Sequence, residues 1–281
     1  MVGIMLLLCS IMPFTACTST EDEPYKPETE QPSDDPNNNE EEDNDTTPVY
    51  GHLTTANTVS DVVNHEAFNG FGRFILPAER SYNDNMTLQN VASMLPYHNY
   101  ITGERAVETI NTMVDYVHDG NTLFYDIYSD ADKQADSRKN NTGLFFFRGE
   151  PGKPFAIVCP GGGFSYVGAI HEGFPLAIAL SKMGYNAFSI QYRTGGAQVA
   201  CEDLAGAIDF IMRHAEELQV STDDYSLWGG SAGARMAAYL GSLRDAGVHQ
   251  CSTSASGNGR DGLYRALRLY AQRSPDIRGY R

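Results

Sequence analysis

Residues 225–233 read Tyr-Ser-Leu-Trp-Gly-Gly-Ser-Ala-Gly and join an apolar, strand-like run to a helix-like run over residues 234–243. A serine between such glycines sits on a turn so tight that its hydroxyl is held clear of the backbone. Only glycine at the flanking positions lets neighbouring segments of the chain approach this closely. The Gly-X-Ser-X-Gly pattern between a strand and a helix therefore predicts a nucleophile elbow, with Ser231 as the nucleophile.

A second glycine motif lies about seventy residues upstream, directly after a strand-like run at residues 155–158. Residues 159–164 read Cys-Pro-Gly-Gly-Gly-Phe and correspond to the oxyanion loop of esterases and lipases, which here begins with Cys-Pro instead of histidine. Backbone N–H groups in such a loop can donate to the oxygen that gains negative charge during acyl transfer. We expect the amides of Gly162, Gly163 and Ala232 to form this oxyanion hole. The alternative is that the glycines serve only tight turns.

Phosphate binding is another common role for glycines after a strand, but the spacing here does not fit it. A dinucleotide fingerprint would need glycine at Tyr166, and Gly168 is followed by Ala-Ile where a P-loop needs Lys-Ser or Lys-Thr. The His-Glu pairs at residues 65–66 and 171–172 lack a second histidine at helical spacing, and no Cys-X-X-Cys occurs. The sequence therefore predicts no cofactor and no metal site. It also favours a packing or pocket-wall role for His171 over a role as the catalytic base.

Strand-like and helix-like runs alternate between residues 144 and 243, as in a mostly parallel, doubly wound α/β sheet. The expected strands are 144–147, 155–158, 187–191 and 225–228, and the expected helices are 172–183 and 204–215. Upstream, apolar residues recur at three- and four-residue steps from Val107 to Val117, between Thr102 as N-cap and Gly120 as stop. This pattern predicts an amphipathic helix that packs on the core.

Residues 144–241 resemble the α/β-hydrolase fold, and specifically the esterase branch related to hormone-sensitive lipase and to bacterial acetyl- and feruloyl-ester hydrolases. The matching motifs follow the family's order: Pro160-Gly-Gly-Gly-Phe164, Gly184-Tyr185, Gln191-Tyr-Arg193, Glu202-Asp-Leu204 with Ala207, and Trp228-Gly-Gly-Ser-Ala-Gly233. The resemblance implies a serine ester hydrolase. It also implies structural, not catalytic, roles for Asp203 and Arg193.

The base and the acid that a serine hydrolase needs both follow the nucleophile in this fold. Fifty residues follow Ser231, with His249 as their only histidine and Asp245, Asp261 and Asp276 as acids. His249 is therefore the one candidate base, although it does not follow a strand-like run. We expect an incomplete α/β-hydrolase that lacks its C-terminal strands, leaves the strand at 225–228 on a sheet edge, and has little activity.

Residues 244–281 differ in composition from the rest of the chain. They contain seven arginines and no lysine, and residues 251–259 show neither helical nor strand periodicity. We interpret this tail as out-of-frame translation after a frame loss near Ser242 or Leu243. The alternative is a genuine basic amphipathic tail, because apolar residues recur at helical spacing between Leu263 and Tyr270.

The first residues of the chain predict export. Residues 4–14 are apolar but too short to span a bilayer, and Cys17 follows them, which resembles a bacterial lipoprotein signal at residues 1–17. A plain secretory signal is the alternative. Residues 18–50 contain twelve acidic residues and Lys26 as their only basic one, which predicts an extended tether. We expect an outer-membrane lipoprotein anchored through Cys17, with surface display as a further expectation, and no nucleic-acid partner.

The predicted organisation is a signal at 1–17, a tether at 18–50, an N-terminal extension at 51–136, a hydrolase core at 137–243 and an atypical tail at 244–281. We expect a serine carboxylesterase-like hydrolase that deacylates carbohydrate esters, or other small esters, outside the cell. Two alternatives remain open: a non-catalytic glycan-binding surface lipoprotein, and a peptidase or thioesterase of the same fold.

Overall fold

The computed structural model describes residues 50–77, 80, 83–94 and 101–245. The chain divides into one unit at residues 1–45 and a second at residues 46–281, and all described residues belong to the second. Several predicted features lie outside the described residues: the signal, the lipidation site at Cys17, the candidate base His249 and the tail from residue 246. The predicted tether also lies outside them, except for Tyr50.

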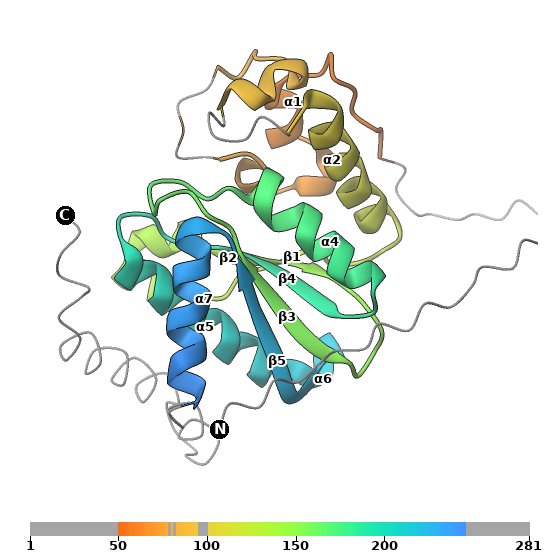
Figure 1. Ribbon diagram of the computed structural model, residues 1–281. Helices are drawn as coiled ribbons and strands as arrows, with labels where there is room; N and C mark the ends of the chain where they lie inside the picture. Colours follow the sequence, from red (N-terminus) through yellow and green to blue (C-terminus); the bar gives the residue numbers. More distant parts are fainter. Residues whose placement is uncertain (1–49, 78–79, 81–82, 95–100, 246–281) are drawn as a thin grey trace, which may run out of the picture. The chain divides into compact units, whose positions relative to one another are not determined.

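A five-stranded sheet forms the centre of the described fold, in the order β1-β2-β4-β3-β5 (Figure 1). Its strands are β1 (Phe124–Tyr125), β2 (Gly143–Phe147), β3 (Pro154–Cys159), β4 (Asn186–Gln191) and β5 (Ser221–Gly229). β3 pairs in parallel with both β4 and β5, which confirms the predicted parallel sheet at its centre. β2 instead runs antiparallel to β4, and β1 antiparallel to β2.

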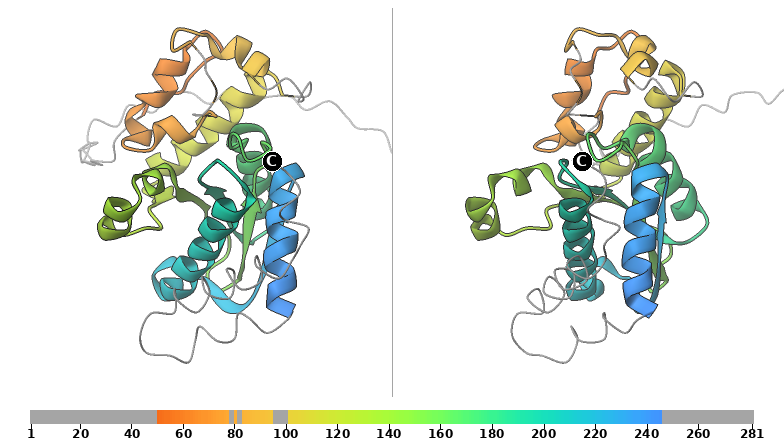
Figure 2. Two further views of the ribbon diagram at one scale, coloured as in Figure 1. Left: turned by 90° about the vertical axis from the view of Figure 1, so that its left-hand side faces the viewer. Right: turned by 60° about the vertical axis from the view of Figure 1, so that its left-hand side comes forward.

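Helices cover both faces of this sheet, as predicted for a doubly wound fold. α4 (Phe174–Lys182) lies on one face, and α5 (Ala197–Arg213) and α7 (Ser231–Asp245) lie together on the other (Figure 2). β2, β3 and β4 are buried along nearly their whole length. The apolar runs of β2 and β3 are therefore continuous, whereas β4 also buries the polar residues Asn186, Ser189 and Gln191.

β5 is longer than the sequence predicts, because it begins at Ser221 and not at Tyr225. Pro154 of β3 pairs with Ser221, whereas the next residue, Phe155, pairs with Tyr225, so residues 222–224 are an interruption of the register. These three residues are polar and exposed, and this is why no strand pattern marks them. In the described part of the chain β5 forms one edge of the sheet, as predicted.

The N-terminal part of the described chain is helical. α2 (Gly103–His118) is the predicted amphipathic helix; the Thr102 hydroxyl accepts a hydrogen bond from the Arg105 amide, and Gly120 follows the helix with φ +79°. The shorter elements are α1 (Val59–Val63), η1 (Glu66–Phe68), η2 (Gly72–Phe74), η3 (Leu88–Met94), α3 (Asp130–Ala135), η4 (Ser137–Asn141), η5 (Ala169–Gly173) and α6 (Ala215–Leu218).

Aromatic rings connect this N-terminal part to the sheet. Phe71 stacks on Phe124 of β1, with ring centroids 5.0 Å apart, and meets the edge of Phe145 of β2 at 5.8 Å. The glycine- and aromatic-rich stretch around Phe71 is therefore part of the hydrophobic core.

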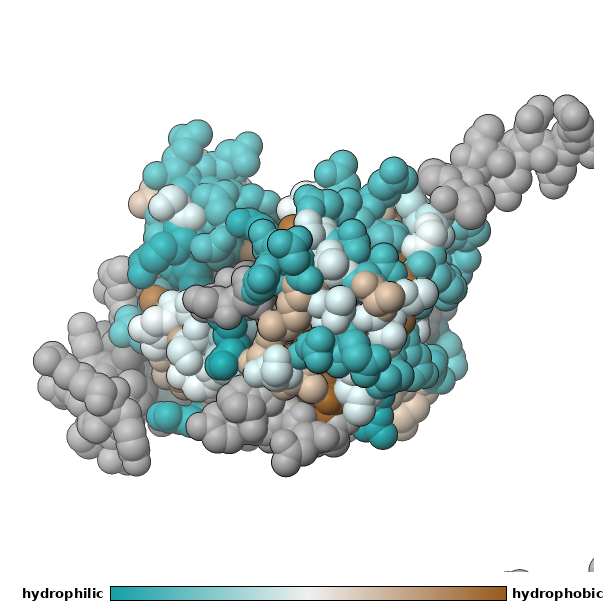
Figure 3. All heavy atoms as spheres, turned by 90° about the horizontal axis from the view of Figure 1, so that it is seen from above, coloured by the Kyte–Doolittle hydropathy of each residue, from teal (hydrophilic) through white to brown (hydrophobic). Residues whose placement is uncertain are grey.

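The surface of the described unit is mainly polar. The face seen from above is largely hydrophilic, with apolar residues scattered between the polar ones (Figure 3). Large hydrophobic side chains that are exposed are few among the described residues: Met183, Tyr185 and Trp228. Within the same residues, no helix has the length and apolar character needed to cross a membrane.

Candidate active site

Ser231 lies on a sharp turn between the end of β5 and the start of α7. Its φ is +50°, in the left-handed region that residues with a side chain seldom adopt. The residue is exposed, so a substrate can reach the hydroxyl. A strained, accessible serine between a strand and a helix is the geometry that the glycine pattern predicts, and strain of this kind persists only where the surrounding structure imposes it.

Two glycines allow α7 to leave β5 so close to β3. A Cβ atom placed on Gly233 would overlap the carbonyl oxygen of Cys159 and would lie 2.6 Å from its carbonyl carbon. A Cβ atom placed on Gly229 would lie 2.7 Å from the same oxygen. The end of β3 thus presses directly against the elbow at both positions, and neither has room for a side chain.

The glycine loop after β3 lies against this elbow. A Cβ atom placed on Gly161 would be 3.1 Å from the Cβ of Ser231 and 3.0 Å from the carbonyl oxygen of Gly230. The two turns meet because β3 and β5 are neighbouring parallel strands, whose carboxyl ends lie at the same edge of the sheet. The structure therefore brings together the two motifs that are about seventy residues apart in sequence.

The loop has a conformation that requires glycine. Gly162 and Gly163 have φ values of +133° and +61°. The carbonyl oxygen of Gly162 accepts hydrogen bonds from the amide and the hydroxyl of Ser165, both at 3.0 Å. Within the described part of the chain, the amides of Gly162, Gly163 and Ala232 donate to no protein acceptor, so these three N–H groups remain available.

His171 does not lie on the open side of the loop. It belongs to η5, its side chain is fully buried, and a Cβ atom placed on Gly168 would be 2.6 Å from the imidazole Cε1. With residues of α2 and α4 it lines a groove of about 280 Å³. This position agrees with the interpretation of His171 as a packing residue or pocket wall.

Arg193 and Asp203 form a buried ion pair behind the site. The Arg193 guanidinium Nη2 lies 2.8 Å from Asp203 Oδ1, and the Arg193 amide donates to Oδ2 at 2.6 Å. Burial alone lowers the pKa of Arg193, but its hydrogen bond to Asp203 raises that pKa above its ordinary value. Tyr128 donates its hydroxyl to the same carboxylate, and the Gly195 amide donates to the Phe164 carbonyl oxygen of the glycine loop. The segment after β4 is thus tied to the loop through Gly195, two residues after Arg193.

Cys159 and Cys201 are buried, free thiols in the described chain. Burial raises the pKa of the Cys201 thiol to about 12 and raises that of Cys159 as well. A thiol that stays protonated is a poor nucleophile, so neither cysteine competes with Ser231 for that role.

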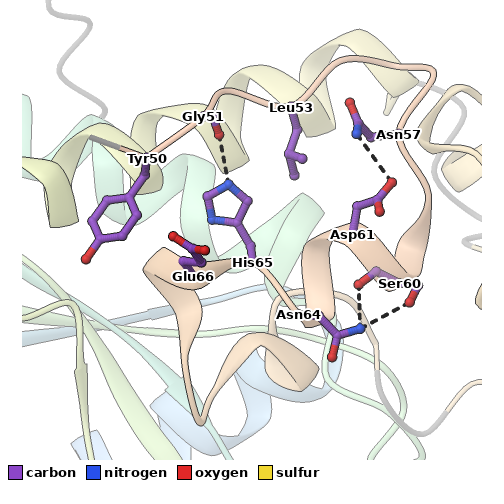
Figure 4. Close-up of a pocket in the computed structure, with 9 residues that line it drawn as sticks. All are labelled: Tyr50, Gly51, Leu53, Asn57, Ser60, Asp61, Asn64, His65 and Glu66. Carbon is purple, nitrogen blue, oxygen red and sulfur yellow. Dashed lines mark hydrogen bonds between the residues drawn. The ribbon is translucent and has the colours of Figure 1, made fainter. Parts of the chain in front are cut away.

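A second cavity, of about 350 Å³, lies at the N-terminal end of the described chain (Figure 4). Its polar side chains bind one another or the local backbone. His65 Nε2 lies 2.8 Å from the Gly51 carbonyl oxygen, and Asn57 donates to Asp61, which also accepts from the Thr58 amide. The two bonds to Asp61 hold the start of α1 in place. The described residues contain no group of three His, Cys, Asp or Glu side chains placed to hold a metal ion.

Glu172 is absent from the predicted site residues, although its carboxylate reaches the glycine loop. The Gly161 amide donates to Glu172 Oε2 at 2.5 Å. One signal in the sequence could have marked this residue: Glu172 is the only acidic residue between Glu150 and Glu202. Local pattern gives no reason to connect it to a loop eleven residues earlier.

The strain at Ser231 leads to a prediction on stability. Ser231→Gly and Ser231→Ala both remove the hydroxyl, but only glycine adopts φ +50° without strain. We expect the glycine variant to be more stable than the alanine variant by about 1 kcal/mol, the reverse of the ordinary order in a helix. Urea denaturation of the two variants measures this difference. A more stable alanine variant would show that position 231 is not held in the left-handed conformation.

Comparison with known proteins finds a family model that matches the part of the chain carrying this site. Residues 148–259 match the family model BD-FAE, of the α/β-hydrolase esterases. No curated protein matches the chain. Among solved structures, an acetyl ester-xyloside bifunctional hydrolase from Caldicellulosiruptor lactoaceticus is 23% identical, with a TM-score of 0.39 over 43% of this chain and 46% of that one.

Two further structures show similarity of the same extent. A sugar hydrolase from Lactococcus lactis is 27% identical, with a TM-score of 0.33 over 36% of this chain and 43% of that one. A hyperthermophilic esterase from the archaeon Pyrobaculum calidifontis is 24% identical, with a TM-score of 0.34 over 38% and 35%. The chain spans less than half the length of each of these three structures. The segment at residues 148–259, which matches the family model, contains β3, β4, β5 and both glycine turns.

Proposed function

We propose that the chain acts as a serine carboxylesterase in which Ser231 is the nucleophile. The observation that supports this most directly is the contact between the strained, exposed Ser231 and a glycine loop whose Gly162 and Gly163 amides are available as donors. This arrangement is suited to acyl transfer, because it holds a hydroxyl next to N–H groups that can stabilise an oxyanion.

The proposed reaction proceeds through an acyl-enzyme. Ser231 Oγ forms a bond to the ester carbonyl carbon while a base takes the hydroxyl proton. The carbonyl oxygen becomes an oxyanion and accepts hydrogen bonds from the amides of Gly162, Gly163 and Ala232, at the positive end of the α7 dipole. Collapse of this intermediate breaks the bond to the alcohol, which leaves with the proton. Water then repeats the sequence and releases the acid.

His249 is the one candidate base, with Asp245, Asp261 or Asp276 as candidates for the acid that would orient it. A serine hydrolase that lacks its base retains only the contribution of the oxyanion hole and of binding, on the order of 10³-fold over the uncatalysed reaction. Because His249 does not follow a strand-like run and lies in the atypical tail, we propose slow turnover for this chain.

Covalent labelling by a fluorophosphonate probe tests the nucleophile. We expect the purified full chain to be labelled, with the adduct on the peptide that contains Ser231, because only an activated serine attacks the probe. Ser231→Ala should abolish labelling while leaving thermal unfolding close to that of the parent. A folded parent chain that takes up no probe would contradict the proposal and favour a non-catalytic binding role.

We further propose carbohydrate esters as substrates and the outer membrane as the location. The support for the substrate is the esterase family match and the resemblance to bacterial acetyl- and feruloyl-ester hydrolases. Release of acetate from acetylated xylo-oligosaccharides, compared with turnover of p-nitrophenyl acetate and methyl ferulate, tests the proposed substrate.

The proposed location is tested through the lipid anchor. Cys17→Ser should move the protein from the detergent phase to the aqueous phase when cells are extracted with Triton X-114. Equal partitioning of the two proteins would exclude the lipid anchor.

A further inference from the structure

The carboxylate of Glu172 lies where the glycine loop meets the elbow. Its Oε2 accepts the Gly161 N–H at 2.5 Å, and a Cβ atom placed on Gly161 would be 2.6 Å from that oxygen. A Cβ atom placed on Gly230, in the elbow itself, would lie 3.1 Å from the same oxygen. One carboxylate oxygen is therefore in contact with both turns, although the proposed chemistry does not use it.

Backbone hydrogen bonds reinforce this connection. The Glu172 amide donates to the Gly168 carbonyl oxygen, and the Gly168 amide donates to the Gly161 carbonyl oxygen, each at 2.9 Å. Both polar groups of Gly161 are thereby engaged: its N–H by the Glu172 side chain and its C=O by Gly168. The Tyr192 hydroxyl also donates to the Gly161 carbonyl oxygen, at 3.4 Å, so Glu172 supplies the only side chain among the described residues that binds the Gly161 N–H.

The bond from Gly161 to Glu172 is of a strong kind. The Glu172 side chain is 16% exposed, so little water competes for its oxygen atoms. An N–H group that donates to a carboxylate makes a charge-assisted hydrogen bond, which is shorter and stronger than a bond between neutral groups. A bond of this strength can fix the position of Gly161, which has no side chain of its own for anchoring.

We propose that Glu172 is a positioning residue that sets the distance between the oxyanion loop and Ser231. Its catalytic consequence rests on the proposed function. Gly162 and Gly163 follow Gly161 directly, so any displacement of Gly161 moves both proposed donors. Oxyanion donors act only within about 2.7–3.1 Å of the oxygen atom that they stabilise. A misplacement of about 1 Å therefore lowers the rate by about 100-fold.

The other role open to Glu172 is to stabilise the helical segment of η5 and α4 as an acidic residue in the first turn of η5. The two roles differ in what a glutamine does. In Glu172→Gln the side-chain carbonyl oxygen can still accept the Gly161 N–H, whereas in Glu172→Ala that acceptor is lost. A positioning role therefore predicts that Glu172→Gln, unlike Glu172→Ala, keeps the Gly161 N–H bonded. A role in stabilising the helical segment predicts no such difference at Gly161.

The test compares four full-length proteins: the parent, Glu172→Gln, Glu172→Ala and Asp61→Ala. Asp61 provides the matched control, because its carboxylate also accepts a backbone N–H, from Thr58 at 2.7 Å, but does so at the start of α1. The readouts are hydrogen–deuterium exchange resolved to the Gly161 amide, the rate constant of fluorophosphonate labelling against probe concentration, and thermal unfolding.

We expect Glu172→Ala to exchange the Gly161 amide about 10- to 100-fold faster than the parent, the loss typical of a hydrogen bond to a charged acceptor. Its maximal labelling rate constant should fall by about 100-fold, with the half-saturating probe concentration unchanged. Glu172→Gln should stay within about three-fold of the parent on both measures, since it keeps the acceptor. Asp61→Ala should leave both measures unchanged.

An unchanged exchange rate of Gly161 in a folded Glu172→Ala chain would overturn the proposal. If Glu172→Ala does not fold, Glu172→Asp replaces it, because the shortened side chain keeps the charge but withdraws the acceptor by one methylene. A folded Glu172→Asp chain with parental exchange would overturn the proposal equally. If no protein takes up the probe, the parent included, the proposed function fails, and the exchange rates still decide whether Glu172 holds the loop.

Discussion

Gly233→Ala lowers the free energy of unfolding by about 3 kcal/mol or more, a large effect for a single methyl group. The added Cβ would overlap the carbonyl oxygen of Cys159 at the end of β3. Backbone is on both sides of the contact, so no side chain can turn away to relieve it. α7 must move away from the sheet, and Ser231, two residues earlier, moves with it.

Gly241→Ala is the matched control, because it adds the same methyl group to the same helix. A Cβ atom placed on Gly241 has nothing within 4 Å. Alanine is favoured over glycine within a helix by about 1 kcal/mol, so this variant should be slightly more stable than the parent. Thermal unfolding followed by circular dichroism compares them: for a domain of this size we expect Gly233→Ala to melt roughly 6–12 °C lower than the parent. Equal melting of the two variants would mean that α7 does not lie against β3 as described.

Asp203→Ala is expected to destabilise the chain by about 3 kcal/mol, since removing one partner of a buried ion pair leaves the other charge uncompensated. The Asp203 side chain is fully buried and that of Arg193 is 5% exposed. The loss also removes the acceptor of the Tyr128 hydroxyl and of the Arg193 amide. Asp136 remains 2.8 Å from the guanidinium and should retain part of the pairing, so we place the loss at the lower end of the usual range.

Asp209→Ala serves as the control on the same helix. Asp209 pairs with Arg213 one turn later at 3.0 Å, but the Arg213 side chain is about half exposed, at 48%. An ion pair of that kind contributes only about 0.5 kcal/mol. Urea denaturation of both variants separates the two cases. A loss for Asp203→Ala as small as that for Asp209→Ala would show that the buried network does not brace β4 against α5.

Elements whose residues interact with near neighbours in sequence could be predicted from the sequence. The apolar run of β3, the N-cap at Thr102 and the turn at Ser231 each have a local signature, and the structure contains all three elements. The start of β5 has no such signature, because residues 222–224 are polar and exposed. The antiparallel direction of β2 was missed as well, since an apolar run carries no information on which strand it will pair with.

The candidate site shows the same limit. Each glycine motif could be recognised alone, but the contact of Gly161 with Glu172 joins a loop to a helix start through the tertiary fold. The exposure of an acidic residue and the direction of its side chain depend on elements that pack around it. Sequence pattern alone therefore treats Glu172 as an ordinary residue at the start of a helix.

The chain contains a single tryptophan, and its position gives it an optical use. Trp228 is the last residue but one of β5, three residues before Ser231; its side chain is 43% exposed and its indole N–H donates to Ser226 Oγ at 2.8 Å. All intrinsic indole emission of the protein therefore comes from the strand that carries the elbow. A ligand or an adduct at Ser231 that changes the solvation of this ring would be visible as a change in emission, without any attached dye.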